Sequence, residues 1–439
     1  MAQTYVEVIS RETIKPSSPT PQHLQKLNLS YLDQLVDPIY VSFISFYQAG
    51  GEEAIDRAGS HAQISQRLKK SLSHTLTSFY SLAGRIQDTF TIDCNDAGVE
   101  FIDARAVDHT HLTNAIQEQP NSIDVNRLKQ YIPVDPSTTA GAQTTKPLFL
   151  VQVTYFDCGG IVVGVRFSHR VADCASVMEF INAWARANET DDLPTPARPI
   201  SYNLANYFPG MEFPSSGFFK TDGEKFRTKR FVFDKVKLAA LGQLVDSNVK
   251  KPTRVELISA FIWKNFMQFS SSTHVDGDNN DKIFTAGHAL NLRARKKCFE
   301  NVFGNCVMAA IASEESSSSG GGEFHEVVSK LRSAIRRVDD DYITKSMQQS
   351  GEGGFLKDMN EFGSMFMKGL VETFVFTSWC GFPVYEADFG WGKPIWFCPV
   401  VLPNNCAILV NSRCGEGIDV WVNMNKDALS ILDAKFKLI

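Results

Sequence analysis

A histidine and an aspartate with a four-residue spacing, His169 and Asp173, lie near the middle of the chain. Imidazole is the side chain best matched to moving a proton near neutral pH. We therefore interpret His169 as a candidate general base and Asp173 as a residue that orders the adjacent turn. The spacing has little specificity alone, since His274 and Asp278 repeat it in a polar stretch typical of a solvated loop. On this pattern, a hydrogen-bonded histidine without a catalytic role is an equally open alternative.

The residues around His169 predict a rigid mount for its side chain. A β-branched run at 161–165 precedes it and predicts a buried strand. Residues 148–156 predict a second strand, and 157–160, with two glycines, predict the turn of a hairpin between the two. Apolar residues recur at helical spacing after Asp173, so we expect a helix to begin there. A strand end that faces a helix start can orient and desolvate an imidazole.

Periodicity and turn residues predict further elements along the chain. Strands are expected at 5–14, 39–47, 229–233, 373–379, 396–401, 406–410 and 418–422, with 396–401 and 406–410 flanking one turn, and two more around a turn within 91–101. Apolar residues from Ser60 onward predict a long amphipathic helix that Gly84 closes. Thr253 and Glu256 form a capping-box pattern at the start of a second helix, and a last helix is expected from Lys426. The serine- and glycine-rich residues 313–323 are expected to form a mobile surface loop, and the C-terminal hundred residues otherwise read as strands and turns.

Length and composition indicate a two-domain globular protein. At 439 residues the chain exceeds what one core usually holds. Five prolines between 194 and 214 interrupt the periodicity, so we expect an N-terminal domain at 1–190, a linker at 191–225 and a C-terminal domain at 226–439. Because strands and helices mix throughout and hairpins occur, the predicted fold class is α/β with mixed sheets.

Charge and cysteine content exclude several functions. A net charge of −5 argues against nucleic-acid binding, which needs clustered lysine and arginine. No apolar run approaches the roughly 20 residues of a membrane span, and the N-terminal residues lack the pattern of a signal peptide. The nine cysteines contain no pair with the two-residue gap of a zinc or redox motif. We expect no metal site, and reduced thiols in the cytoplasm.

A second motif, Asp388-Phe389-Gly390-Trp391-Gly392, stands near the C-terminus. Two glycines around a tryptophan, followed by a proline, predict a tight turn packed under a large ring. We interpret Asp388, Gly390, Trp391 and Gly392 as structural residues that hold a loop at the domain interface.

The two motifs together, HxxxD at 169–173 and DFGWG at 388–392, resemble the paired signatures of the plant acyl-CoA-dependent acyltransferases called the BAHD family. The resemblance extends over essentially the full length of the chain. It implies two similar-sized domains related to chloramphenicol acetyltransferase, with an active-site channel between them. It also implies that acyl-CoA enters from one face, that the alcohol enters from the other, and that His169 stands between them.

Shorter blocks at 7–16, 93–96, 156–160 and 414–417 resemble the alkaloid O-acetyltransferase branch of that family. This implies a monomeric enzyme that uses acetyl-CoA as co-substrate, without a permanently bound cofactor, to acetylate an alkaloid or similar bulky specialised metabolite. The chain has no basic residue between Trp379 and Asp388, which argues against an anionic acceptor such as shikimate. Benzoyl or hydroxycinnamoyl donors, terpenol or amine acceptors, and a member of the fold that binds without turnover stay open as alternatives.

The resemblance also implies roles for residues outside the two motifs. Asp173 is expected to point away from His169 and to pair with Arg293, which fixes the turn. Thr377 and the indole N–H of Trp379 are expected to donate hydrogen bonds to the tetrahedral oxyanion, although Trp379 also fits a place in the core. The phosphates of CoA are expected near the helix start that carries three residues, Lys251, Thr253 and Arg254, where a solvated cap is the simpler alternative. No second histidine accompanies Cys174, so we do not expect a cysteine nucleophile.

Overall fold

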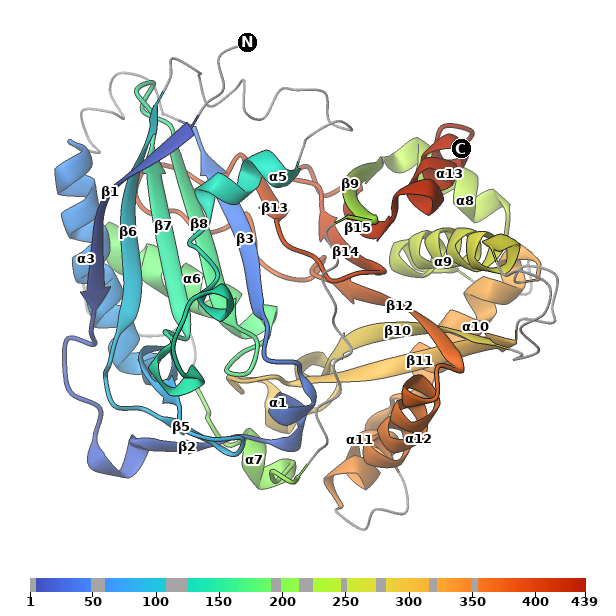
Figure 1. Ribbon diagram of the computed structural model, residues 1–439, viewed down its shortest axis with the longest axis horizontal. Coiled ribbons are helices and arrows are strands. Elements are labelled where there is room, and N and C mark those ends of the chain that lie inside the picture. The colour runs from blue at the N-terminus through green and yellow to red at the C-terminus, as the bar shows by residue number, and fades with distance from the viewer. Residues whose placement is uncertain are drawn as a thin grey trace. The chain divides into compact units, whose positions relative to one another are not determined.

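The computed structural model of the protein describes residues 5–48, 60–107, 125–190, 199–212, 224–245, 251–273, 282–315, 322–348 and 354–439 (Figure 1). The chain divides into two compact units, of which the first contains 1–215, 298–306 and 382–401. The second contains 216–297, 307–381 and 402–439. The chain therefore leaves the first unit near residue 215 and returns to it twice. These two returning segments were not part of the expected boundaries at 190 and 226, which stay a prediction.

A mixed sheet with the strand order β1-β6-β7-β8-β3-β13 forms the centre of the first unit. In that order its strands span Tyr5–Ile14, Val99–Val107, Phe149–Tyr155, Ile161–Ser168, Tyr40–Tyr47 and Trp396–Pro399. β6 and β7 run parallel, and the other neighbours pair antiparallel. β7 and β8 are buried along their whole length and form the predicted hairpin, which the structure confirms. A small sheet with the order β2-β5-β4 accompanies it and spans Lys26–Asn28, Thr91–Asp93 and Arg85–Ile86.

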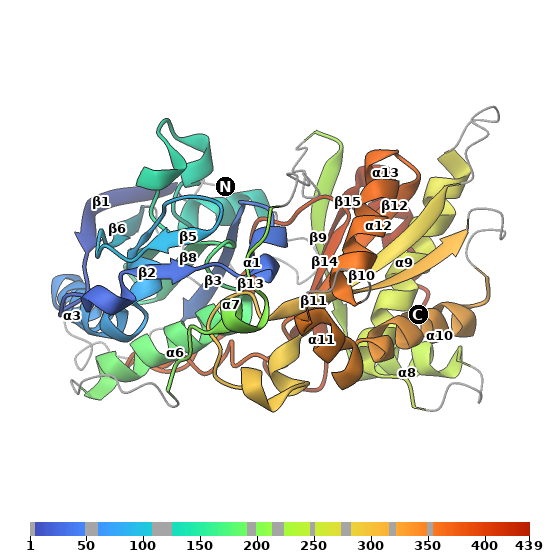
Figure 2. The same cartoon turned by 90° about the horizontal axis from the view of Figure 1, so that it is seen from below.

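Helices cover one face of this sheet, and a turn-rich segment covers the other. The helices of the first unit are α1 (Tyr31–Leu35), α3 (His61–Ser78), α5 (Val125–Leu128), α6 (Cys174–Thr190) and α7 (Leu204–Tyr207), with short 3-10 turns at Gln22–Leu24, Tyr80–Ala83, Lys129–Tyr131, Pro136–Thr138 and Gln143–Thr145. Figures 1 and 2 show α3 and α6 side by side beneath the sheet. The indole of Trp184 on α6 joins them, because its N–H donates to the Leu68 carbonyl and to Ser71 Oγ, both at 3.1 Å. On the opposite face, the Tyr131 carbonyl lies directly against Gly164 of β8.

A second mixed sheet, with the order β11-β10-β12-β14-β15-β9, forms the centre of the second unit. Its strands span Val307–Glu315, Ile283–Asn291, Val371–Ser378, Cys406–Asn411, Ile418–Asn425 and Phe226–Phe233. Its helices are α8 (Lys235–Gln243), α9 (Arg254–Thr273), α10 (Phe324–Arg337), α11 (Asp340–Met347), α12 (Phe355–Met367) and α13 (Lys426–Phe436), with 3-10 turns at Leu292–Ala294 and Lys297–Phe299. The apolar faces of α9, α10 and α13 pack with the strands in one core, in which Trp263 is fully buried. The two mixed sheets with their helices confirm the predicted α/β fold class.

The helix starts were predicted more accurately than the helix ends. The predicted start of α9 is confirmed, because Thr253 N–H donates to Glu256 Oε2 at 2.7 Å and Glu256 N–H donates to Thr253 Oγ1 at 3.2 Å. The start of α13 at Lys426 is confirmed as well. The predicted end of α3 at Gly84 is wrong, since the helix ends at Ser78 and Gly84 is extended, with φ −85°. Gly84 serves close packing instead, because a Cβ there would lie 2.6 Å from the Asp93 carbonyl oxygen.

Other expectations along the chain have mixed outcomes. The strands expected around turns within 91–101 and on either side of residue 402 are present, but in neither pair do the two strands bond to each other, because β5 and β6, and likewise β13 and β14, belong to different sheets. Residues 313–315 are the end of β11 and pair with β10, whereas 316–321 lie outside the described residues. The C-terminal hundred residues include α11 and α12 as well as strands. The second histidine–aspartate pair, His274 and Asp278, also lies outside the described residues.

The helices of the described residues do not meet the requirements of a membrane span. Within the described ranges, none of them combines the length and the apolar character that a bilayer span requires.

Gly164→Ala should destabilise the first unit markedly. A Cβ at this position would stand 1.8 Å from the Tyr131 carbonyl oxygen, so the covering segment must move away from β8. Such overpacking typically lowers the free energy of unfolding by about 1–3 kcal/mol. Gly287→Ala in β10 is the matched control, since no atom of the described residues lies within 4 Å of a Cβ there. Thermal unfolding of both variants checks this, and an equal effect of the two substitutions would contradict it.

Candidate active site

His169 follows directly on the last residue of β8, where the backbone is fixed from two sides. β8 pairs with β7 and β3, and the N–H of His169 itself donates to the Ile39 carbonyl at 2.9 Å. The side chain is half-buried. The predicted strand end facing a helix start is confirmed, since α6 begins five residues later at Cys174.

Asn305 contacts His169 at two points. The Nδ1 atom of His169 lies 3.0 Å from Asn305 Oδ1, and Asn305 Nδ2 donates to the His169 carbonyl at 2.7 Å. Asn305 belongs to the returning segment 298–306 and is 1% exposed. One asparagine therefore holds both the ring and the backbone of the histidine.

Asp33 holds Asn305 in turn. Its Oδ1 accepts from the Asn305 backbone N–H at 2.8 Å and from Asn305 Nδ2 at 2.9 Å. Its Oδ2 accepts from the backbone N–H of Ser30 at 2.9 Å and from Ser30 Oγ at 2.6 Å. Burial raises the pKa of Asp33, and the hydrogen bonds from Ser30 and Asn305 oppose that shift. The start of α1, the returning segment and the end of β8 are thus joined through one buried carboxylate.

Asp173 fixes the other side of the same segment. Its Oδ1 accepts from Ser176 N–H at 2.8 Å, which caps the N-terminus of α6, and its Oδ2 accepts from Cys306 N–H at 3.1 Å. Ser176 Oγ donates to the Gly304 carbonyl and accepts from Gly304 N–H, both at 3.1 Å. Asp173 therefore acts on His169 through the segment that carries Asn305. Its pairing with Arg293, which lies in the 3-10 turn Leu292–Ala294 of the second unit, stays a prediction.

Burial lowers the pKa of His169 below its ordinary value. The charge of Asp173 and the hydrogen bond with Asn305 act in the opposite direction, but desolvation is the larger effect. The imidazole is therefore neutral near pH 7, which is the form that can accept a proton.

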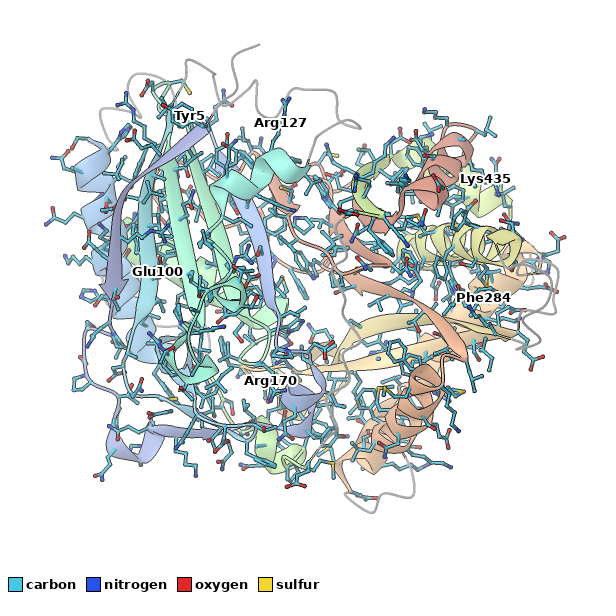
Figure 3. The ribbon with its side chains drawn as sticks, in the orientation of Figure 1. Tyr5, Glu100, Arg127, Arg170, Phe284 and Lys435 are labelled. Atoms are coloured by element: carbon cyan, nitrogen blue, oxygen red, sulfur yellow. The ribbon has the colours of Figure 1, made fainter. Side chains whose placement is uncertain are left out.

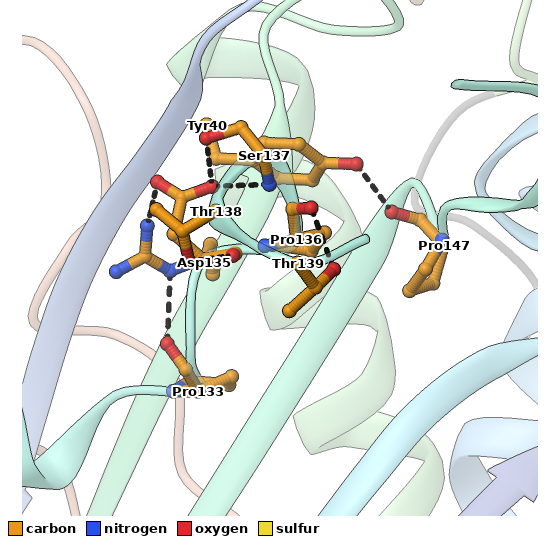
Figure 4. Close-up of polar contacts among 9 residues, drawn as sticks. Tyr40, Pro133, Asp135, Pro136, Ser137, Thr138, Thr139 and Pro147 are labelled. Carbon is orange, nitrogen blue, oxygen red and sulfur yellow. Dashed lines mark hydrogen bonds and ion pairs between the residues drawn. The ribbon is translucent and has the colours of Figure 1, made fainter. Parts of the chain in front are cut away.

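Two arginines brace the turn around His169. Arg170 lies beside α1 (Figure 3), where its Nη1 donates to the Gln34 carbonyl at 3.0 Å and its Nη2 to the Thr89 carbonyl at 3.3 Å. On β8, Arg166 donates to the Pro133 carbonyl at 3.0 Å and pairs with Asp135. Figure 4 shows the Asp135 carboxylate bonded to Ser137 of its own turn, through contacts of 2.8 and 2.7 Å. The segment that covers β8 is thereby tied to the strand that positions His169.

The DFGWG residues fold a loop within the first unit. Asp388 Oδ1 accepts from the N–H groups of Gly390 and Gly392 at 2.8 and 2.9 Å. The ring of Trp391 stacks on Phe389, with centroids 5.4 Å apart. This loop is tied to the sheet and to α6, because Tyr47 donates to the Ala387 carbonyl at 3.0 Å and Asn188 Nδ2 to the Phe389 carbonyl at 2.7 Å. These contacts support the interpretation of the motif as structural.

Thr377 and Trp379, the expected oxyanion donors, stand at the end of β12 in the second unit. Thr377 pairs with Ala289 of β10 and with Ile408 of β14. Trp379 follows the strand, is 4% exposed, and donates its backbone N–H to the Leu409 carbonyl at 2.8 Å. The geometry brings these two residues together, and their catalytic role stays a prediction.

The expected CoA-binding residues Lys251, Thr253 and Arg254 precede or begin α9 in the second unit. Arg254 is exposed, but its Nη1 already donates to the Gly415 carbonyl at 3.0 Å. The Lys251 carbonyl accepts from Arg332 Nη2 at 2.8 Å. Arg254 therefore already holds a neighbouring turn through Gly415, and its role in binding the phosphates of CoA stays a prediction.

The structure gives no support to thiol or metal chemistry. Burial and the nearby charge of Asp173 raise the pKa of the Cys174 thiol well above its ordinary value, which disfavours the thiolate form that a nucleophile needs. In the described part of the chain, no group of histidine, cysteine and carboxylate side chains could hold a metal ion.

Sequence reasoning did not identify Asp33 and Asn305 as site residues. Ser30 and Asp33 have the spacing of a capping box, which predicts a helix start but not a buried contact with residue 305. Asn305 follows Gly304 in a stretch without periodicity. Only the tertiary structure shows that Asn305 contacts His169 and that Asp33 contacts Asn305.

The chain is similar to known proteins over nearly its whole length. The sequence model of the Transferase family matches residues 4–439. The chain is 36% identical to stemmadenine O-acetyltransferase of Catharanthus roseus, over 98% of this chain and 97% of the relative. It is 34% identical to a limonoid 1-O-acetyltransferase of Citrus sinensis, over 95% and 94%. The fold is similar to the crystal structure of vinorine synthase, with a TM-score of 0.79 and 32% identity over 97% of this chain and 96% of that one.

Asp173→Asn should loosen the returning segment more than it damages α6. An asparagine can still cap the helix through its amide oxygen, but its NH₂ group would then face the N–H of Cys306. We expect a loss of about 1–3 kcal/mol in the free energy of unfolding, because a buried donor is left without an acceptor. Hydrogen exchange measured by mass spectrometry should show faster exchange in peptides that contain 304–306.

Asp234→Asn is the matched control for this prediction. Asp234 caps α8 by accepting from Lys237 N–H at 2.9 Å, and that contact is local. The control should change stability by a few tenths of a kcal/mol at most. If both variants lose equally little stability and 304–306 stays protected, Asp173 does not hold the segment.

Proposed function

Because the chain belongs to the Transferase family, the BAHD acyltransferases, we propose that it acetylates a hydroxyl group of an alkaloid or similarly bulky metabolite, with acetyl-CoA as donor. The protein is an acyl-CoA-dependent acyltransferase that transfers groups other than amino-acyl groups. The observation that carries the finer proposal is the identity of 36% to stemmadenine O-acetyltransferase over nearly the whole of both chains. The neutral, fixed imidazole of His169 supports the chemistry.

In this proposal His169 acts as general base. The alcohol oxygen attacks the thioester carbonyl carbon while the imidazole takes the hydroxyl proton. The tetrahedral intermediate then collapses, the C–S bond breaks, and the CoA thiolate takes the proton from the imidazolium. A thioester is already electrophilic, so the reaction needs no covalent enzyme intermediate.

The remaining roles are part of the same proposal. Thr377 and Trp379 donate to the oxyanion, since neutral donors aimed at the developing charge stabilise it. The α9 start, with the cations of Lys251 and Arg254 and the positive end of the helix dipole, receives the phosphates of CoA. Arg293 pairs with Asp173. A monomeric state and a cytoplasmic location, expected from the sequence, also stay predictions.

A terpenoid alcohol is the second candidate acceptor. The limonoid 1-O-acetyltransferase of Citrus sinensis is 34% identical to this chain, close to the value for the alkaloid relative. Both acceptor classes are large and mainly apolar, and an apolar site binds either by burying its ring system.

His169→Ala should lower kcat about 10²–10⁴-fold while the protein stays folded, because it loses the general base. In the unsubstituted enzyme, kcat/KM should rise with pH, since only the neutral imidazole is active. Burial lowers the pKa of His169, so the midpoint of the rise should lie below the ordinary value of an imidazole, about pH 6.5.

The pH profile and the rate are measured by thiol release from acetyl-CoA between pH 4.5 and 8. His23→Ala is the control, because His23 is an exposed histidine in a surface turn and should leave the rate unchanged. A His169→Ala enzyme with near-normal kcat would exclude the mechanism.

Acetyl-CoA should be used in preference to malonyl-, benzoyl- and coumaroyl-CoA. A competition assay offers the four donors together with an alkaloid alcohol, a limonoid alcohol and shikimate. We expect the acetyl ester of the alkaloid alcohol as the main product, because the relative that is 36% identical is named as an acetyltransferase of stemmadenine. Preferential acetylation of the limonoid supports the second candidate, and coumaroyl transfer to shikimate would overturn both while leaving the family unchanged.

A further inference from the structure

The amide group of Asn305 has a determined orientation. One Nδ2 hydrogen points to Asp33 Oδ1 at 2.9 Å, and the other points to the His169 carbonyl at 2.7 Å. A backbone carbonyl can only accept a hydrogen bond, and Asp33 accepts at both of its oxygens. A reversed amide would place Asn305 Oδ1 against these two acceptors, which is repulsive. The amide oxygen must therefore face the ring of His169.

This orientation determines which imidazole nitrogen carries the hydrogen. Asn305 Oδ1 lies 3.0 Å from His169 Nδ1, and an amide oxygen only accepts. A hydrogen bond at this distance therefore requires the hydrogen on Nδ1. In the neutral ring Nε2 is then left with its lone pair.

We propose that Asn305 is a positioning residue that holds His169 as the Nδ1–H tautomer, and that Asp33 holds Asn305. The inference about the tautomer stands on the hydrogen bonds alone, whereas its use in catalysis rests on the proposed function. Nε2 is then the atom that takes the proton from the alcohol, and Nδ1 keeps its hydrogen throughout the reaction.

A neutral partner for Nδ1 suits a reaction in which the base must give its proton back. A carboxylate in direct contact would favour the imidazolium strongly and raise its pKa. Asn305 places the negative charge of Asp33 one side chain further away, with the amide between the two. The amide cannot take up the proton on Nδ1, so the proton that the imidazolium gives to the CoA thiolate is the one on Nε2.

Asp173 helps to fix the backbone on the C-terminal side of Asn305. It accepts from Cys306 N–H, and the neighbouring Asn305 N–H donates to Asp33. Two consecutive backbone amides are thus held by two different carboxylates, which fixes the direction in which the Asn305 side chain leaves the chain. The aspartate of the HxxxD motif thereby contributes to the tautomer without touching the imidazole in any of the described contacts.

Tautomers of His169 are distinguished by nitrogen chemical shifts. The full chain is labelled with ¹⁵N-histidine, and long-range ¹H–¹⁵N correlation spectra are recorded at pH 8, where the ring is neutral. The signals of His169 are assigned by their loss in His169→Gln. We expect a protonated Nδ1 and an unprotonated Nε2 in the unsubstituted protein, and a shift of both nitrogens toward the Nε2–H pattern in Asn305→Ala.

Asn188→Ala is the matched control for the spectra. Asn188 also bridges two elements with its amide, from Ser71 of α3 to the Phe389 carbonyl, but it stands near the far end of α6. Its loss should lower stability without changing the His169 signals. An Nε2–H pattern in the unsubstituted protein, or an unchanged Nδ1–H pattern in Asn305→Ala, would overturn the proposal.

Asn305→Ala also separates positioning from a merely structural role in the kinetics. Without the amide oxygen the ring can carry its hydrogen on Nε2, so kcat should fall about 10²-fold, with the KM for acyl-CoA within about twofold. A folded Asn305→Ala protein with unchanged kcat would contradict the use of the tautomer in catalysis.

The acyl-transfer assay and the nitrogen spectra test the proposed function and the inference about Asn305 separately. If no acyl transfer is detected with any donor and acceptor, the proposed function falls, but the spectra still decide the tautomer. If transfer is normal and Asn305→Ala keeps the spectrum of the unsubstituted protein, the inference about Asn305 falls and the proposed function stands.

Discussion

The buried carboxylate of Asp33 is the interaction on which the arrangement around His169 depends. A carboxyl group that is 4% exposed is tolerated only when its oxygens are hydrogen-bonded, and each oxygen of Asp33 accepts two hydrogen bonds. The donors come from Ser30 and Asn305, which lie 275 positions apart in the chain. Neither partner can move away without leaving a buried charge unsatisfied. The start of α1 and the returning segment are therefore stable only together, and the ring of His169 takes its orientation from both.

The two motifs of the family contribute to this arrangement in different ways. Asp173 uses its carboxylate to join the start of α6 to Cys306, and so stabilises the position of a neighbour rather than the imidazole itself. Asp388 uses its carboxylate to close a loop on Gly390 and Gly392, which the rings of Phe389 and Trp391 then attach to the sheet. Each aspartate organises backbone, and neither is assigned a part in the proposed proton transfer.

The secondary structure that carries His169 could be predicted from local sequence patterns. The strand partners and the role of Asn305 could not, because they depend on contacts between residues far apart in the chain. The β7–β8 hairpin and the α6 start follow from a β-branched run, two glycines and a helical period, all within about 40 residues. The strands of Trp396 and Cys406 flank one turn, as expected, but the sequence did not indicate their partners: they pair with β3 and with β12 and β15, in different sheets. Asn305 carries no periodic or turn signal beyond its glycine neighbour. Its role arises from acceptors at 33 and 169, which no local pattern encodes.

The return of the chain to the first unit has a consequence for its synthesis. His169 and Asn305 are 136 positions apart, so at a translation rate of about 5–20 residues per second the histidine leaves the ribosome roughly 7–27 s before its partner. During this interval Asp33 has neither the N–H nor the NH₂ of Asn305 to bind, and β3 exposes the edge that β13 later covers. The nascent N-terminal half thus carries an unsatisfied carboxylate and an open strand edge, which are the features that invite mispairing and chaperone binding. A protein released before residue 305 would contain His169 and still lack the side chain that orients its ring.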